Sequence, residues 1–142
     1  MGKPNPVVHF EMGYKDRDRM VKFYQEVFGW ETQNMGEEMG NYVVAHTTAT
    51  DDNGMVQTPG VINGGFYQKT DNPLSQAPSV VVSVDDIQEA MKGVVAAGGK
   101  ILGGMNQAGE HTDEPQMIPG VGLWISAQDT EDNRFSILQA KT

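Results

Sequence analysis

The stretch VVHFEMGYKDRDRMVKFYQEVFGWE, residues 7–31, decides the fold. Its first part alternates apolar and polar side chains, which predicts a strand over residues 6–12 with His9 and Glu11 on one face and Phe10 on the other. Asp16 is a suitable helix N-cap, and apolar residues then recur at helical spacing as far as Gly29, which ends the helix. The stretch therefore predicts a strand and a helix, followed by a second strand at residues 30–33.

The remainder of the chain extends this pattern and then repeats it. Two more strands, at residues 42–48 and 61–68, precede a polar linker with two prolines at residues 70–78. A new strand follows, and Asp86 with Glu89 three positions later forms a capping-box signal for a second helix that the pair Gly98-Gly99 stops. The glycine-rich stretch 103–122 reads as a loop over the ligand site. The strands of this half are expected at residues 79–84, 100–103, 122–127 and 134–140.

A shift of 70 residues lays the second half over the first. Asp16 then aligns with Asp86, and Gly29 aligns with Gly99. The apolar face of the first strand also aligns with the apolar face of the strand that opens the second half. The fold class is therefore α+β, with two tandem β-α-β-β-β modules in a single domain over residues 1–142. Module one covers about 6–69 and module two about 79–140. Each sheet is expected to pack one face on its helix, and the other faces to form a curved mixed sheet around a cleft.

Composition limits the classes of function. The chain has no cysteine, which excludes disulfides, thiolate metal sites and a cysteine nucleophile. Ten Lys and Arg against 19 Asp and Glu give a net charge of -9, which disfavours nucleic acid and anionic membranes as partners. No segment has the length of a signal peptide core or of a transmembrane helix. We therefore expect a cytoplasmic protein.

Four stretches carry a resemblance to a known family. Residues 7–31 are similar to the opening module of the glyoxalase/bleomycin-resistance/extradiol-dioxygenase (vicinal oxygen chelate) superfamily, a strand with a central His and a helix ending in FY-x-x-x-F-G. SVVVSVDDIQEAMKGVVAAGGKI (79–101) resembles its second module, and SAQDTEDNRFSILQA (126–140) its closing hairpin. GVINGGFY (60–67) resembles the closing strand of module one in a glyoxalase-related bacterial subgroup. The superfamily includes lyases, isomerases, dioxygenases and drug-sequestering proteins, so the resemblance implies a fold more than a reaction.

The resemblance also implies four metal-ligand positions, on the first and last strand of each module. Only His9 matches the family's ligands. Ser79 stands at the first-strand position of module two and Ser136 at its last-strand position, while the last-strand position of module one falls near Phe66. Serine is a poor ligand for such metals and phenylalanine is none. We therefore expect no metal cofactor, with a divalent metal held by other residues as the alternative.

The remaining polar and aromatic residues suggest a binding cleft. His9 is the candidate catalytic base or donor with Glu11 as its orienting group, or it is a hydrogen-bonded cleft residue without a reaction. Aromatic side chains on bordering strands could stack a ligand or pack in the core. The expected ligand-binding residues are His9, Tyr42, Phe66, Ser79, Trp124 and Ser136.

The expected function is binding of a small molecule in the cleft, by a homodimer. Two alternatives remain open. One is a divergent metal-dependent lyase or dioxygenase acting on a substrate with vicinal oxygens. The other is a ligand sensor or assembly partner without turnover. Whether the chain is an enzyme is not decided by these residues.

Overall fold

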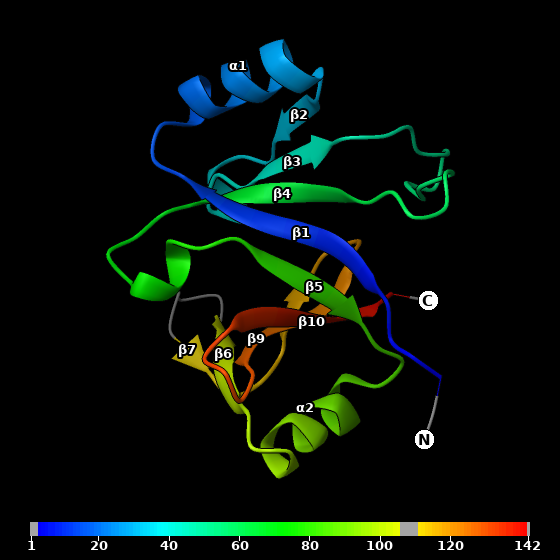
Figure 1. The fold of residues 1–142 in the computed structure, drawn as a ribbon, viewed down its shortest axis with the longest axis vertical. Coiled ribbons are helices and arrows are strands. Elements are labelled where there is room, and N and C mark those ends of the chain that lie inside the picture. Colours follow the sequence, from blue (N-terminus) through cyan, green and yellow to red (C-terminus); the bar gives the residue numbers. More distant parts are fainter. Residues whose placement is uncertain (1–2, 106–110, 142) are drawn as a thin grey trace. The chain divides into compact units, whose positions relative to one another are not determined.

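The computed structural model describes residues 3–105 and 111–141. The chain divides into two compact units, one of His9–Pro78 and one that combines Met1–Val8 with Ser79–Thr142. Each unit has its own helix and its own strands (Figure 1). The fold class is α+β, as predicted. Within the described residues, no helix has the length and apolar character required to cross a bilayer.

The unit His9–Pro78 is the first β-α-β-β-β module. In its sheet the strand order is β2-β3-β4-β1, and β4 runs parallel to β1 while the other neighbours are antiparallel. The predicted linker holds a short 3-10 turn, Pro73–Ser75, and another turn, Glu37–Met39, lies between β2 and β3. The elements are β1 (Val7–Tyr14), α1 (Arg17–Phe28), β2 (Glu31–Asn34), β3 (Val43–His46) and β4 (Asn63–Gln68).

The other unit repeats this element order with two additions. Its strands follow the order β5-β10-β9-β6-β7, and β10 runs parallel to β5 as β4 does to β1. Two short strands, β7 and β8, occupy part of the stretch 103–122 that was expected to be a loop; residues 106–110 of that stretch lie outside the described residues. The elements are β5 (Ser79–Ser83), α2 (Ile87–Ala96), β6 (Lys100–Met105), β7 (His111–Thr112), β8 (Gln116–Ile118), β9 (Gly122–Gln128) and β10 (Arg134–Ala140).

Helix α1 begins and ends at the predicted residues. The Asp16 carboxylate accepts a hydrogen bond from the backbone N–H of Arg19 at 3.1 Å, and Gly29 has the left-handed φ of 71° that favours glycine at a helix end. The helix packs on the sheet through residues such as Met20 and Tyr24, yet none of its residues is buried. It therefore covers the sheet without closing against it.

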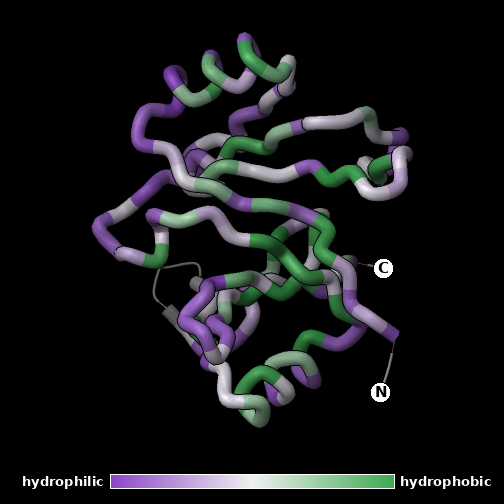
Figure 2. The backbone as a smooth tube through the Cα atoms, in the orientation of Figure 1, coloured by the Kyte–Doolittle hydropathy of each residue, from purple (hydrophilic) through white to green (hydrophobic). Residues whose placement is uncertain are grey.

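Helix α2 packs more closely on its sheet than α1 does, since it has a buried residue. Its N-cap Asp86 accepts hydrogen bonds from the backbone N–H groups of Gln88 and Glu89, at 3.0 and 3.2 Å. Ile87 is only 1% exposed and lies in an aliphatic core of Ile125, Ala127 and Ile137. Figure 2 shows hydrophobic and hydrophilic stretches alternating along α2, as expected for a helix with one face on a sheet. The helix ends at Ala96, before the predicted glycine pair.

Candidate functional site

Strand β1 separates two environments. Phe10, Met12 and Tyr14 pack in the core beneath α1, so the alternation of a strand places His9 and Glu11 on the face away from α1. Strand β4 contributes to this same face the residues paired with His9, Glu11 and Gly13, namely Asn63, Gly65 and Tyr67. We call this surface the His9 face. Glu11 on this face is buried, at 8% exposure.

Tyr42 links the two predicted catalytic residues. Its hydroxyl oxygen lies 3.0 Å from Nε2 of His9 and donates to Oε2 of Glu11 at 3.2 Å. The Tyr42 ring reaches this position by lying over Gly65, where any Cβ would collide with it. His9, Glu11 and Tyr42, all predicted site residues, are therefore brought together in one hydrogen-bonded group.

Burial fixes the protonation states in this group. The pKa of Tyr42 is raised far above its ordinary value, first by burial and then by the charge and the hydrogen bond of Glu11. The phenol therefore keeps its proton and donates a hydrogen bond to Glu11, so the His9 ring must donate a hydrogen bond to the Tyr42 oxygen from Nε2. Burial also lowers the pKa of His9 to about 4. The ring is neutral near pH 7, and its lone pair is on Nδ1.

Phe66 lies on the other side of the sheet. Its partner on β1 is Met12, and its ring packs 5.2 Å from the ring of Tyr24 and 6.4 Å from that of Trp30, beneath α1. The prediction that Phe66 shares a face with His9 is wrong, because a one-residue error in strand register reverses the direction of a side chain. The residue that faces Tyr42 at this level is Gly65.

The second unit presents its predicted residues on the sheet face away from α2. Ser136 pairs with Val81, two positions from Ser79, so Ser79 and Ser136 share that face. Trp124 pairs with Leu138 and shares it too. Both serines are buried, with Ser79 at 7% and Ser136 at 0% exposure. These three residues therefore share one sheet face.

Arg134 was not predicted as part of this surface. Its Nη2 donates a hydrogen bond to Oγ of Ser79 at 3.1 Å. The sequence did contain a signal, since Arg134 stands two residues before Ser136 and so has the same strand parity. The Ser126 hydroxyl, paired with Ser136 across the β9–β10 ladder, is buried with no hydrogen-bond partner among the described residues.

A metal could also be held by ligands at positions other than the family's four. Across residues 3–105 and 111–141, no group of three or more His, Asp, Glu or Cys side chains is arranged to hold a metal ion. At the family's ligand positions, one module offers His9 and the glycine-containing strand β4. The other offers the hydroxyls of Ser79 and Ser136.

Comparisons with known proteins agree on the fold. A sequence model of the Glyoxalase/Bleomycin resistance protein/Dioxygenase superfamily matches residues 7–114. A solved structure of methylmalonyl-CoA epimerase in complex with methylmalonyl-CoA and NH4+ is 15% identical, with a TM-score of 0.64, and the match covers 97% of this chain and 96% of that one. A variant of the Streptomyces coelicolor methylmalonyl-CoA epimerase bound to 2-nitronate-propionyl-CoA is 14% identical, with a TM-score of 0.63 and coverage of 96% and 95%.

A third solved structure is described only as a hypothetical protein from Bacillus halodurans C-125. It is 12% identical, with a TM-score of 0.64, and the match covers 99% of this chain and 97% of that one. No curated protein sequence gives a significant match. At such identities the likeness concerns the fold, and function has to be argued from the side chains.

Proposed function

The chain belongs to the Glyoxalase/Bleomycin resistance protein/Dioxygenase superfamily, and from this premise we propose that it binds a small molecule on the His9 face without the family's usual four metal ligands. The observation that carries the proposal is the hydrogen-bonded group of His9, Tyr42 and Glu11. Polar side chains held in fixed directions on a sheet face are the usual means of orienting a ligand.

The chemistry of this group favours binding over proton abstraction. The Nδ1 atom of His9 can accept a hydrogen bond from a hydroxyl, amide or amine of a ligand. As a base it is weak, because burial holds its pKa at about 4, well below the pH at which a cytoplasmic enzyme would operate. The ligand that fits the group therefore carries a hydrogen-bond donor and needs no proton removed by this ring.

The donor set argues against the usual metal site. His9 supplies one imidazole, but its Nε2 is engaged with Tyr42. The positions of the other module carry hydroxyls, and Ser79 already accepts a hydrogen bond from Arg134. Neutral serine hydroxyls bind divalent metals poorly. We therefore derive no step that uses a metal, and the metal-dependent lyase or dioxygenase remains the alternative that experiment must exclude.

The decisive experiment combines metal analysis with ligand screening. Purified protein is incubated with Zn, Ni, Mn and Fe(II), freed of excess metal, and analysed for bound elements. It is then screened by thermal shift against small molecules, including acyl-CoA esters because two similar structures hold such ligands. We expect no stoichiometric metal, and a ligand that raises the Tm of the wild type.

Two variants make the result specific to the His9 face. His9→Gln should abolish the ligand's stabilising effect, while Lys22→Gln, at an exposed position of helix α1 on the other side of the sheet, should retain it. Near-stoichiometric metal that is lost in His9→Gln would replace our proposal with the metal-dependent alternative. A ligand effect that persists in His9→Gln would remove the His9 face from the function. Product formation with the ligand would separate an enzyme from a sequestering protein or sensor.

The proposed assembly is a cytoplasmic homodimer. Helix α1 exposes large apolar side chains, with Val27 at 54% and Phe28 at 61%, and exposed apolar groups of this kind are common at interfaces. Sedimentation equilibrium should give a dimer for the wild type and a shift toward monomer for Phe28→Ser. The matched control is Val95→Ser on α2, where Val95 is 59% exposed. A monomeric wild type would contradict the proposal.

A further inference from the structure

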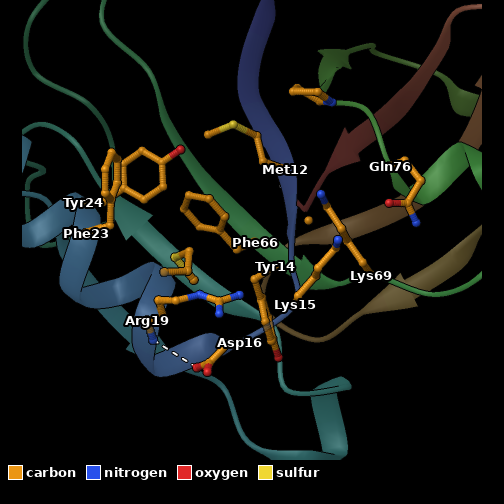
Figure 3. Close-up of a pocket in the computed structure, with 13 residues that line it drawn as sticks. Met12, Tyr14, Lys15, Asp16, Arg19, Phe23, Tyr24, Phe66, Lys69 and Gln76 are labelled. Atoms are coloured by element: carbon orange, nitrogen blue, oxygen red, sulfur yellow. Dashed lines mark hydrogen bonds between the residues drawn. The ribbon is translucent and has the colours of Figure 1, made fainter.

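We propose that the hollow beneath α1 is a second binding site, for a small carboxylate with an apolar or aromatic body. We call it the α1 hollow. It has a volume of about 500 Å³ and lies between the first half of α1, the ends of β1 and β4, and the segment after β4 (Figure 3). Its floor includes Met12 and Phe66, which point away from the His9 face, so the floor lies on the opposite side of the sheet from His9 and Tyr42.

The α1 hollow exists because the helix does not close on the sheet. No α1 residue is buried, whereas α2 buries Ile87 in its own core. Met20 and Tyr24 line the hollow from the helix, and Phe66 lines it from the sheet. Phe23, at the rim, is 52% exposed. A volume of this size is within the range that holds small organic ligands. Methionines and aromatic rings provide an apolar lining that adapts to the shape of a ligand.

Three cations surround this apolar floor. They are Lys15, Arg19 and Lys69, out of ten Lys and Arg in a chain of net charge -9. None of them has a carboxylate within 4.0 Å among the described residues, in contrast to neighbouring cations such as Lys22, which pairs with Glu26. Figure 3 shows Arg19 on the helix side of the hollow and Lys15 and Lys69 on the strand side. The hollow is therefore a local region of positive charge.

One acidic residue lines the hollow, and its charge is already engaged. Asp16 caps α1 by accepting a hydrogen bond from the backbone N–H of Arg19, which directs its carboxylate to the helix N-terminus, and the three cations outnumber this one negative charge. At the mouth of the hollow, the aliphatic stem of Lys69 is packed over Gly13, where a Cβ would collide with its Cγ; Gly13 has the strand parity of His9, so Lys69 reaches the hollow around the end of β1. This packing restricts the Lys69 side chain and lowers the entropy lost when its ammonium group binds an anion.

The apolar floor and the three surrounding cations together favour one class of ligand. A guanidinium group binds a carboxylate through two parallel hydrogen bonds, and the two lysines add charge. A highly charged phosphate would leave the apolar floor unused, and a neutral apolar molecule would leave the cations unused. An amphipathic monocarboxylate uses both. The inference is independent of the proposed function, because it involves neither His9 nor Tyr42.

The test uses 2-naphthoate as the probe and 2-naphthalenemethanol as its neutral counterpart. The protein is labelled with 13C at the methionine methyl groups, which are assigned by single Met→Leu variants. We expect 2-naphthoate to shift the signals of Met12 and Met20 in a saturable way. Met55 and Met117, which are 64% and 62% exposed, serve as internal references and should not move. The neutral alcohol should bind several-fold more weakly.

Charge variants make the test specific. Arg19→Gln and Lys69→Gln should each weaken the affinity for 2-naphthoate by about 5-fold or more, while Lys22→Gln, on the outer side of the same helix, should leave it unchanged. His9→Gln should also leave it unchanged, which separates this site from the one on the His9 face. The proposal is overturned by the absence of a saturable shift up to about 10 mM, by equal binding of the alcohol, or by shifts of all methionines together.

Discussion

At the scale of single residues, Tyr42 determines the geometry of the His9 face. Its hydroxyl accepts from His9 and donates to Glu11, so its loss would remove a partner from two partly buried polar groups at once. An unsatisfied buried polar group costs about 1–3 kcal/mol. A ligand hydroxyl placed at the same point could take over both bonds. The polar chemistry of the face therefore depends on a side chain from outside β1.

The sequence suggested Glu11 as the orienting group of His9, but it did not predict Tyr42 as the residue that links them. Strand alternation placed His9 and Glu11 on one face, because that depends only on local periodicity. Tyr42 directly precedes β3, and its direction depends on the pairing of β3 with β4, where Val44 lies opposite Gly65. Such cross-strand pairing is a property of the tertiary fold. No local pattern specifies it.

The lowered pKa of His9 predicts a specific pH dependence of stability. Its pKa is about 4 in the folded state against 6.5 in the unfolded chain, so between these values the unfolded state binds the proton and the folded state does not. Stability is therefore complete above pH 6.5 and is lost as the pH falls toward 4. Urea unfolding should show the wild type losing up to about 2 kcal/mol more than His9→Gln between about pH 7 and about pH 4.5. Equal losses in the two proteins would mean that His9 is not buried in this way.

At the scale of elements, strand β4 depends on two adjacent glycines. The ring of Phe10 lies against Gly64 on the α1 side, and the ring of Tyr42 lies against Gly65 on the His9 face. Glycine weakens a strand in general, but here it admits an aromatic ring close to the backbone on each face. Gly64 leaves room for a ring of the core, and Gly65 leaves room for the Tyr42 ring of the candidate site. The strand was predicted from its apolar residues, while the reason for its glycines lies in the neighbouring strands.

A pair of glycine substitutions tests this role. Gly65→Ala places a methyl group where the Tyr42 ring lies, so it should destabilise the protein by about 2 kcal/mol and disturb the His9–Tyr42 contact. Gly93→Ala, in α2, has open space around the new Cβ and should stabilise by about 0.5–1 kcal/mol. Urea unfolding of both variants measures whether the free energy of unfolding falls in the first variant and rises in the second. Neutral behaviour of Gly65→Ala would show that Tyr42 moves aside without cost.

Predictability differed between kinds of element. Helix α1 was predicted from its N-cap Asp16 to its terminal Gly29, because capping chemistry is local. The short strands β7 and β8 were not predicted, since two or three residues carry no measurable periodicity. Phe66 was assigned to the wrong face because the 70-residue shift carries Ser136 onto Phe66, whereas Ser136 pairs with Val81 and the counterpart of Val81, Glu11, pairs with Gly65. Errors were therefore concentrated where register, rather than propensity, decides.

At the scale of the whole molecule, the two modules share an order of elements but not a core chemistry. In each, the last strand runs parallel to the first. The core beneath α1 includes the aromatic rings of Phe66, Tyr24 and Trp30, whereas the core beneath α2 is built largely from Ile87, Ile125 and Ile137. This difference explains why a 70-residue shift aligns caps and turns while side-chain identities agree poorly. Caps follow from backbone geometry, and core residues from packing volume.

The excess of acidic residues predicts how the stability of the whole molecule responds to salt. A net charge of -9 produces self-repulsion that disfavours the compact state. The described ion pairs lie at exposed positions, for example Lys3 with Asp85 at 77% and 85% side-chain exposure, so little attraction is lost when salt screens them. Raising NaCl from about 10 mM to about 100 mM shortens the screening length from about 30 Å to about 10 Å. Stability should therefore increase with salt.

Calorimetry at the two salt concentrations measures this response. A gain of about 1 kcal/mol corresponds to an increase in Tm of about 4 °C for a chain of this length. Choline chloride should give the same increase as NaCl, because screening depends on ionic strength and not on the identity of the cation. A larger effect of Na⁺ would indicate a bound cation. A fall in Tm would mean that attraction between opposite charges outweighs the repulsion among the 19 acidic residues.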